Sequence, residues 1–131
     1  MAQQAMPPIG MISWQDLTVA NAKEICDFYQ AVVGWSARAE DMGGYQDYSM
    51  RLPGSNQTIA GICHARGQNA DLPPQWLIYI TVADIHESAA KVVELGGAVL
   101  SPPRRLGGGD FCVIRDPAGA VCALFQPIGL I

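Results

Sequence analysis

The chain contains an internal repeat, and this repeat limits the fold more than any other feature. The tetrapeptide Thr-Val-Ala-Asn at 18–21 returns as Thr-Val-Ala-Asp at 81–84, 63 residues later. At the same offset Gly34 matches Gly97. A repeat of this length in a chain of 131 residues indicates two copies of one small module. We therefore expect the functional site where the two copies meet.

Length and charge exclude several classes of function. A chain of 131 residues fits one compact domain or two fused halves. Half of the residues are apolar, but no run approaches the roughly 18 apolar residues of a membrane helix. Residues 1–8 lack a basic start and a hydrophobic run, so we expect a cytoplasmic protein without a membrane partner. The formal charge of −4 argues against nucleic acid as a partner.

The four cysteines do not form a recognisable motif. Cys26, Cys63, Cys112 and Cys122 stand singly in apolar stretches and never approach a C-x-x-C spacing. This spacing excludes a zinc knuckle and a thioredoxin-type motif. We expect small buried side chains and no indicated disulfide.

The first copy is predicted to have the order βαβββ. Residues 12–19 are rich in strand formers, and Asn21 with Glu24 has the pattern of a capping box before a helix that ends at Gly34. Three strand-like runs separated by turn residues follow at 35–39, 45–52 and 57–65. The predicted apolar face of the helix consists of Ile25, Phe28, Tyr29, Val32 and Val33.

The same order is predicted for the second copy. A strand at 76–82 precedes a helix that is capped by Asp84, has an apolar face of Ile85, Ala89, Val92, Val93 and Leu95, and stops at Gly96-Gly97. Strands are predicted at 98–100, 110–115 and 120–126, and the prolines at 102–103 indicate a sheet edge or a bulge. The predicted organisation is a tail at 1–9, a first module at 10–65, a linker at 66–74 and a second module at 75–127.

Four short motifs together resemble the vicinal oxygen chelate superfamily, which includes glyoxalase I, extradiol dioxygenases and bleomycin resistance proteins. They are Asp-Leu-Thr-Val at 16–19, Phe-Tyr and Val-Gly-Trp at 28–29 and 33–35, Val-Glu-Leu-Gly-Gly at 93–97 and Asp-Pro-Ala-Gly at 116–119. The resemblance implies an α+β fold in which two tandem βαβββ modules place curved mixed sheets around a cavity. It also implies a homodimer, because many small members of the family pair.

The resemblance also implies where a metal would bind. Family enzymes commonly hold a divalent metal on four His, Gln or Glu side chains, one from the first and one from the last strand of each module. Aligning the motifs assigns these positions to Trp14, Ala60, Leu77 and Ala123, none of which can bind such a metal. A shift of one residue would bring in Gln15 but would leave the other three positions without a ligand. We therefore expect no metal and no cofactor.

Aromatic and apolar side chains are predicted to line the cavity instead. If the pleat alternates, Trp14, Asp16 and Thr18 face inward from the first strand, as do Leu77, Tyr79 and Thr81 from its counterpart. The predicted ligand-binding residues are Trp14, Asp16, Tyr48, Ala60, Tyr79, Phe111, Ala123 and Phe125. Such walls suit flat aromatic guests, and Asp16 would orient a cationic or hydroxyl group.

Three functions remain open at this stage. The first is metal-independent binding of a small aromatic or hydrophobic molecule, as in drug or antibiotic sequestration or in a carrier. The second is an enzyme, either a lyase or isomerase with Asp16 as general base or a metal enzyme with other ligands. The third is a folded interaction module whose aromatic side chains are closely packed. His64, at the end of a strand, could approach the rim of the cavity.

Overall fold

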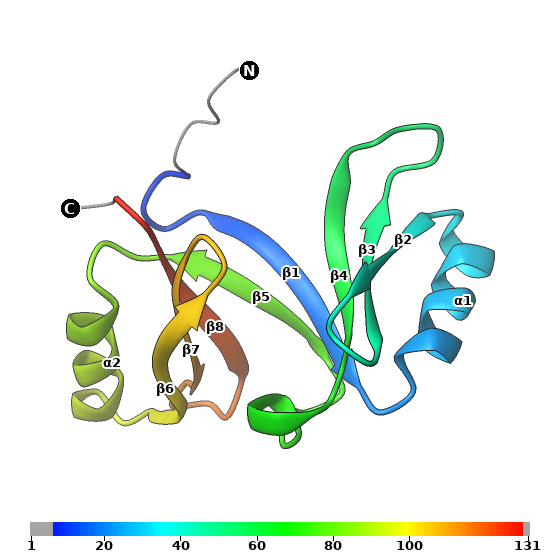
Figure 1. The fold of residues 1–131 in the computed structure, drawn as a ribbon. Coiled ribbons are helices and arrows are strands. Elements are labelled where there is room, and N and C mark those ends of the chain that lie inside the picture. Colours follow the sequence, from blue (N-terminus) through cyan, green and yellow to red (C-terminus); the bar gives the residue numbers. More distant parts are fainter. Residues whose placement is uncertain (1–6, 130–131) are drawn as a thin grey trace. The chain divides into compact units, whose positions relative to one another are not determined.

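A computed structural model describes residues 7–129, so residues 1–6 of the predicted tail lie outside the described residues. Within that range the chain has two α-helices, eight strands and one 3₁₀ turn, and the predicted order βαβββ is confirmed for both modules (Figure 1). The elements are β1 (Ile12–Val19), α1 (Ala22–Val33), β2 (Ser36–Asp41), β3 (Gln46–Arg51), β4 (Thr58–His64), η1 (Gly67–Asn69), β5 (Trp76–Thr81), α2 (Ile85–Glu94), β6 (Ala98–Leu106), β7 (Gly109–Arg115) and β8 (Val121–Pro127).

The chain divides into two compact units close to the repeat boundary. The first unit is Trp14–Trp76, and within the described residues the second combines residues 7–13 with residues 77–129. The N-terminal residues join the second unit through its backbone. The N–H of Gly10 donates to the carbonyl of Thr81 at 2.8 Å, and the N–H of Thr81 donates to the carbonyl of Met11 at 2.9 Å.

The first unit contains a four-stranded mixed sheet with α1 on one face. The strand order is β2-β3-β4-β1, in which β1 runs parallel to β4 and the other neighbours are antiparallel. Leu17 from β1, Met50 from β3 and Ile62 from β4 belong to one core cluster with Ala22 and Cys26 from α1. Burial of these apolar side chains fixes which face of the sheet the helix covers.

Two features of α1 differ from the prediction. The side chain of Asn21 makes no capping hydrogen bond to the backbone of the helix, and its amide nitrogen donates to the carboxylate of Glu24. The buried side of the helix is the side of Ala22 and Cys26, whereas Phe28 is 53% exposed and Val32 is 64% exposed. The predicted stop at Gly34 is confirmed, since this residue has a φ of 86° that only glycine adopts readily.

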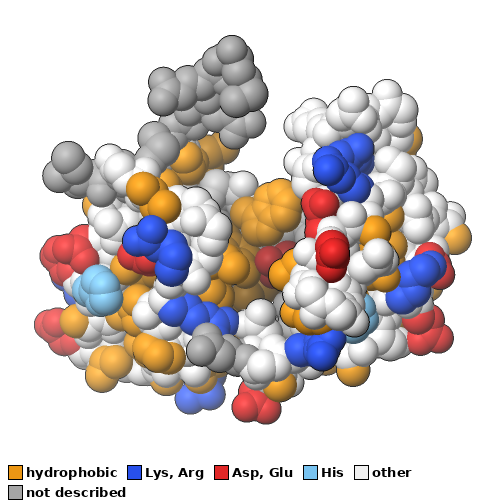
Figure 2. All heavy atoms as spheres, in the orientation of Figure 1, with side chains coloured by type: hydrophobic (Ala, Val, Ile, Leu, Met, Phe, Trp, Pro, Cys, Tyr) orange, Lys and Arg blue, Asp and Glu red, His pale blue; other side chains and the backbone are white. Residues whose placement is uncertain are grey.

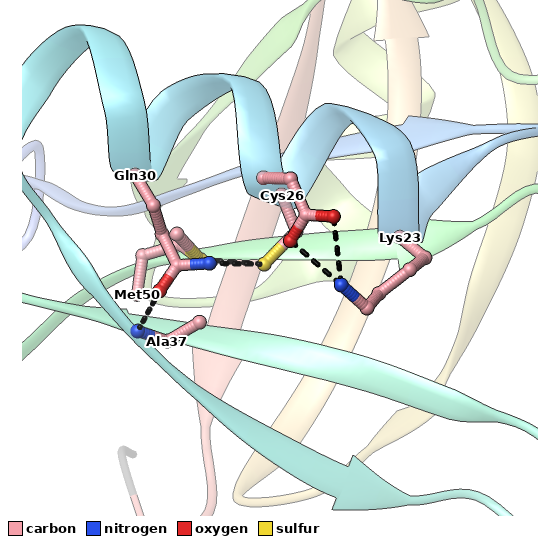
Figure 3. Close-up of polar contacts among 6 residues, drawn as sticks. Lys23, Cys26, Gln30, Ala37 and Met50 are labelled. Atoms are coloured by element: carbon pink, nitrogen blue, oxygen red, sulfur yellow. Dashed lines mark hydrogen bonds and ion pairs between the residues drawn. The ribbon is translucent and has the colours of Figure 1, made fainter.

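Polar and sulfur contacts tie α1 to the sheet of the first unit (Figure 3). The side-chain oxygen of Gln30 accepts the backbone N–H of Ala37 in β2 at 3.2 Å. The amide nitrogen of Gln30 lies 3.8 Å from the sulfur of Cys26, which lies 4.0 Å from the sulfur of Met50 in β3. The contacts therefore connect the helix with two strands of the sheet.

The second unit repeats this arrangement with its own helix. The strand order is β5-β8-β7-β6, and β5 runs parallel to β8. Ile85 from α2 packs with Cys112, Ile114 and Leu124 from the sheet. Asp84 caps α2 as predicted, because its carboxylate accepts the N–H groups of the second and third helical residues, both at 3.1 Å.

The edge strand β6 is longer than predicted. It continues through Pro102 and Pro103 as far as Leu106 and lies at the end of the strand order, with two register shifts against β7. The prediction of an edge or a bulge at the prolines is therefore confirmed.

Hydrophobic side chains remain on the surface over α2 (Figure 2), where Val93 and Leu95, both predicted to face the core, are 62% and 71% exposed.

Gly109 and Gly108 offer a matched test of sheet packing. A Cβ atom at Gly109 would lie 2.2 Å from the carbonyl oxygen of Gln126, whereas one at Gly108 would meet nothing within 4 Å. We expect Gly109→Ala to lower the free energy of unfolding by about 2 kcal/mol, because the backbone of β8 must shift to accept the methyl group. Gly108→Ala should change it by less than about 0.5 kcal/mol. Urea denaturation of both variants measures this difference, and equal values would contradict the packing described.

Candidate functional site

Each sheet has one face that its helix does not cover, and the strand register determines which side chains lie on it. In the first unit Asp16 is paired with Gly61, and Gly61 is also paired with Ser49. Because neighbouring residues of a strand point to opposite faces, these three residues lie opposite the core side chains Leu17 and Ile62. The first non-helical face consists of Trp14, Asp16, Thr18, Asp47, Ser49, Gly61 and Cys63.

The first non-helical face is polar and acidic. One carboxylate oxygen of Asp47 accepts the backbone N–H of His64 at 2.9 Å and lies 3.4 Å from Nδ1 of the same residue. Asp47 also forms a hydrogen bond with the thiol of Cys63. Beside it, the hydroxyl of Ser49 donates to Glu40 at 3.0 Å. These contacts hold the carboxylate of Asp47 in a fixed position.

The thiol of Cys63 is kept in its protonated form. Burial raises its pKa well above the ordinary value, and the negative charges of Asp16 and Asp47 raise it further. The thiolate is the nucleophilic form of cysteine, so a raised pKa makes Cys63 a poor nucleophile at neutral pH. All four cysteines are free thiols. Cys26 and Cys112 are fully buried as predicted, whereas Cys63 and Cys122 are only partly buried.

The second non-helical face is aromatic and apolar. It consists of Leu77, Tyr79, Thr81, Phe111, Val113, Ala123 and Phe125. The rings of Tyr79 and Phe111 lie 6.1 Å apart and are tilted by 33°. The guanidinium of Arg104 lies 4.7 Å from the centre of the Phe111 ring, a cation–π contact. Tyr79 and Phe111 are only 5% and 2% exposed, so this face is a buried aromatic layer with a positive group at one side.

The structure places six of the eight predicted ligand-binding residues on these two faces. Trp14 and Asp16 lie on the first face, and Tyr79, Phe111, Ala123 and Phe125 lie on the second.

The inward orientation predicted for Tyr48 and Ala60 is wrong. Tyr48 is paired with Ile62, and both Tyr48 and Ala60 pack in the core beneath α1. Sequence reasoning chose the members of β3 and β4 that point toward the helix. Asp47 and Ser49, on either side of Tyr48, and Cys63 in β4 occupy the non-helical face, and the sequence analysis missed all three. The alternation of polar Asp47 and Ser49 with apolar Tyr48 and Met50 was the signal that could have identified them.

Strand register also corrects one of the four positions implied for a metal. Asp16 is paired with Gly61 in the first unit, just as Tyr79 is paired with Ala123 in the second. The counterpart of Ala123 is therefore Gly61 and not Ala60, because the first module has one more residue between its paired positions.

The corrected positions are Trp14, Gly61, Leu77 and Ala123, and none has a side chain that binds a divalent metal. Among residues 7–129, no three His, Cys, Asp or Glu side chains are grouped closely enough to hold a metal ion. The donor set at these positions therefore does not fit the metal that the fold family commonly holds.

The fold and the sequence together show the family. The family model of the Glyoxalase/Bleomycin resistance protein/Dioxygenase superfamily matches residues 9–124, and the chain belongs to this superfamily. The predicted family and the predicted α+β fold are thereby confirmed.

Two curated relatives have informative names. The chain is 29% identical over 119 residues to "Putative glyoxylase CFP32" of Mycobacterium bovis, with 90% of the chain and 44% of the relative covered. It is 27% identical over 133 residues to "Anthracycline biosynthesis protein DnrV" of Streptomyces peucetius, with 89% and 47% covered. The chain thus spans about half the length of these relatives.

A solved structure supports the fold assignment. Methylmalonyl-CoA epimerase from Mycobacterium tuberculosis is similar with a TM-score of 0.57 at 15% identity, with 93% of each chain covered. Identity at this level shows a shared fold.

Within residues 7–129, neither helix is long and apolar enough to cross a membrane. Homodimer formation and a cytoplasmic location stay predictions.

The electrostatic effect of Asp16 on Cys63 can be tested through thiol reactivity. Asp16→Asn removes a negative charge that raises the pKa of Cys63, so a larger fraction of thiolate should form at a given pH. We expect the rate of Cys63 alkylation by iodoacetamide at pH 8.5 to rise by about two- to five-fold, since each pKa unit changes the thiolate fraction up to tenfold. Mass spectrometry of the alkylated peptides gives the rate, and Cys122 serves as the internal control. An equal change at Cys122 would point to general loosening of the fold.

Proposed function

We propose that this chain binds a small, flat, mainly apolar molecule against the non-helical faces of its sheets, without a metal at the four family positions. The chemistry of those positions supports the proposal most directly. Trp14, Gly61, Leu77 and Ala123 replace donor side chains with an indole, a hydrogen atom and two aliphatic groups. Such positions can contact an apolar ligand but cannot polarise a carbonyl through a metal.

The aromatic side chains of the second face supply the binding surface. Tyr79 and Phe111 are neighbouring rings that are 5% and 2% exposed, so a ligand must displace the side chains that cover them, and Phe125 is paired with Phe111 across β7 and β8. Offset or edge-on contacts between aromatic rings contribute about 0.5–1.5 kcal/mol beyond the burial of apolar area.

One relative suggests the chemical class of the ligand. The Streptomyces peucetius relative is named for anthracycline biosynthesis, and an anthracycline is a flat polycyclic aromatic compound. Aromatic polycycles of this kind match the chemistry of the second non-helical face. Sequestration or transport of such a compound is the role we propose.

Binding of an anthracycline in the presence and absence of EDTA tests the proposal. We expect quenching of ligand fluorescence with the same dissociation constant in both conditions, because no metal takes part. Phe111→Leu should weaken binding by about three- to ten-fold, since it removes an aromatic ring but keeps an apolar side chain. Val32→Ala, on the exposed side of α1, is the matched control and should bind as the wild type does. Loss of binding in EDTA that added Zn²⁺ or Ni²⁺ restores would overturn the proposal.

An enzyme that uses Asp16 as general base is the second candidate. A Cβ atom placed on Gly61 would lie 3.3 Å from Cβ of Asp16 and 3.5 Å from the ring of Trp14, so these two side chains pack over Gly61. The opposite face of the same strand packs into the core, which holds the backbone of Asp16 in place. A carboxylate on a backbone held in this way can accept a proton from a carbon atom adjacent to a carbonyl group.

Deuterium exchange separates catalysis from binding. In D₂O, an Asp16 base would exchange the protons next to the carbonyl of 1-indanone faster than buffer does, and Asp16→Asn should abolish the excess rate. NMR follows the loss of these proton signals. Asp47→Asn is the control, because Asp47 lies on the same face but is engaged by His64 and Cys63. A wild-type rate equal to that of buffer would reject the enzymatic candidate and leave the binding function standing.

A further inference from the structure

A separate pocket lies on the helix side of the first unit. It has a volume of about 400 Å³ and lies between the start of α1, β1 and the segment before β5. Its lining residues all belong to the first unit and are Leu17, Val19, Asn21, Ile25, Phe28, Tyr29, Pro74, Gln75 and Trp76. Leu17 lies on the face of β1 opposite Asp16, so this pocket is distinct from the non-helical face. Its size is within the range of small-molecule pockets.

Three aromatic rings form one wall of the pocket. Phe28 and Tyr29 meet edge to face at 5.1 Å, and Tyr29 meets Trp76 at 5.3 Å with an angle of 80° between the rings. A planar guest can therefore stack on one ring and meet the edge of another. Phe28 is 53% exposed, so a ligand that covers it removes apolar surface from water.

The rings are held in position before any ligand arrives. Trp35 lies 5.8 Å from Tyr29 in a stacked arrangement and 5.9 Å from Trp76. The indole N–H of Trp76 donates to the hydroxyl oxygen of Tyr29 at 3.0 Å. Side chains that are already ordered lose little conformational entropy on binding, which favours affinity.

The polar groups in the pocket indicate which ligand it accepts. Tyr29 uses its oxygen to accept the bond from Trp76, which leaves its own O–H group to donate. The amide nitrogen of Asn21 donates to Glu24, which leaves its carbonyl oxygen to accept. None of the lining residues carries a charge, so a charged guest would lose hydration without compensation.

We propose that this pocket is a second binding site, which takes an uncharged planar aromatic compound carrying a hydrogen-bond acceptor beside a donor, such as an aromatic lactam. The acceptor of the ligand receives the O–H of Tyr29, and the donor of the ligand reaches the side-chain carbonyl oxygen of Asn21. The site is independent of the ligand proposed for the non-helical faces. It uses the opposite side of the first sheet and different aromatic residues.

The three tryptophans of the chain provide a position-specific test. Trp76 lines the pocket, Trp35 lies behind it, and Trp14 lies on the non-helical face. Titration of the ¹⁵N-labelled protein with 2-quinolinone should shift the indole N–H signal of Trp76 most and that of Trp14 least. A largest shift at Trp14, or no saturable shift at Trp76 up to millimolar ligand, would overturn the proposal.

Substitutions give the second part of the test. Tyr29→Phe removes the donor but keeps the ring, and we expect the affinity for 2-quinolinone to fall by about three- to ten-fold. Phe28→Ala removes a half-exposed ring that is not needed for the core, and should weaken binding by at least about threefold. Val93→Ala, on the exposed side of α2, should leave this affinity unchanged. Wild-type affinity in both pocket variants, with the folded spectrum preserved, would overturn the proposal.

Discussion

Parallel pairing between the first and last strands of each module is the constraint on which the rest of the structure depends. It joins β1 to β4 and β5 to β8, and it sets Asp16 opposite Gly61 and Tyr79 opposite Ala123. Because side chains alternate along a strand, this register decides which residues the helix covers and which remain for a ligand. A slip of one residue would exchange the two sets, and burial of Leu17 and Ile62 beneath α1 opposes such a slip.

The same backbone plan carries different chemistry in the two modules. Where the second non-helical face has Phe111 and Phe125, the equivalent places in the first have Asp47 and Cys63. The tilted rings of Tyr79 and Phe111 form a buried apolar layer, whereas the acidic face fixes a carboxylate and keeps a thiol protonated. A duplicated module can therefore carry two unlike sheet faces while the fold stays constant.

Aromatic residues serve two purposes in the first unit. Trp35 and Trp76 support Tyr29, and together they close the space between α1 and the segment before β5. Phe28 extends this group toward the solvent, on the side of the helix that the core does not use. The helix is therefore not a simple cover for the sheet, since its outer rings complete a pocket lined without charge.

The sequence by itself determined the duplicated order of elements, the family and the lack of metal-binding side chains, because repeats, glycine stops and residue chemistry are local properties. It also placed Asp16 and Phe111 on the correct strand faces. Tertiary structure alone decided the orientation of Tyr48 and Ala60. Strand pairing determines which side chains of β3 and β4 face the helix, and the first module has one more residue between its paired positions than the second, which shifts the residue equivalent to Ala123. It likewise decided that Phe28 lies outside the core, because helical periodicity gives the spacing of a face but not how far the sheet extends beneath it.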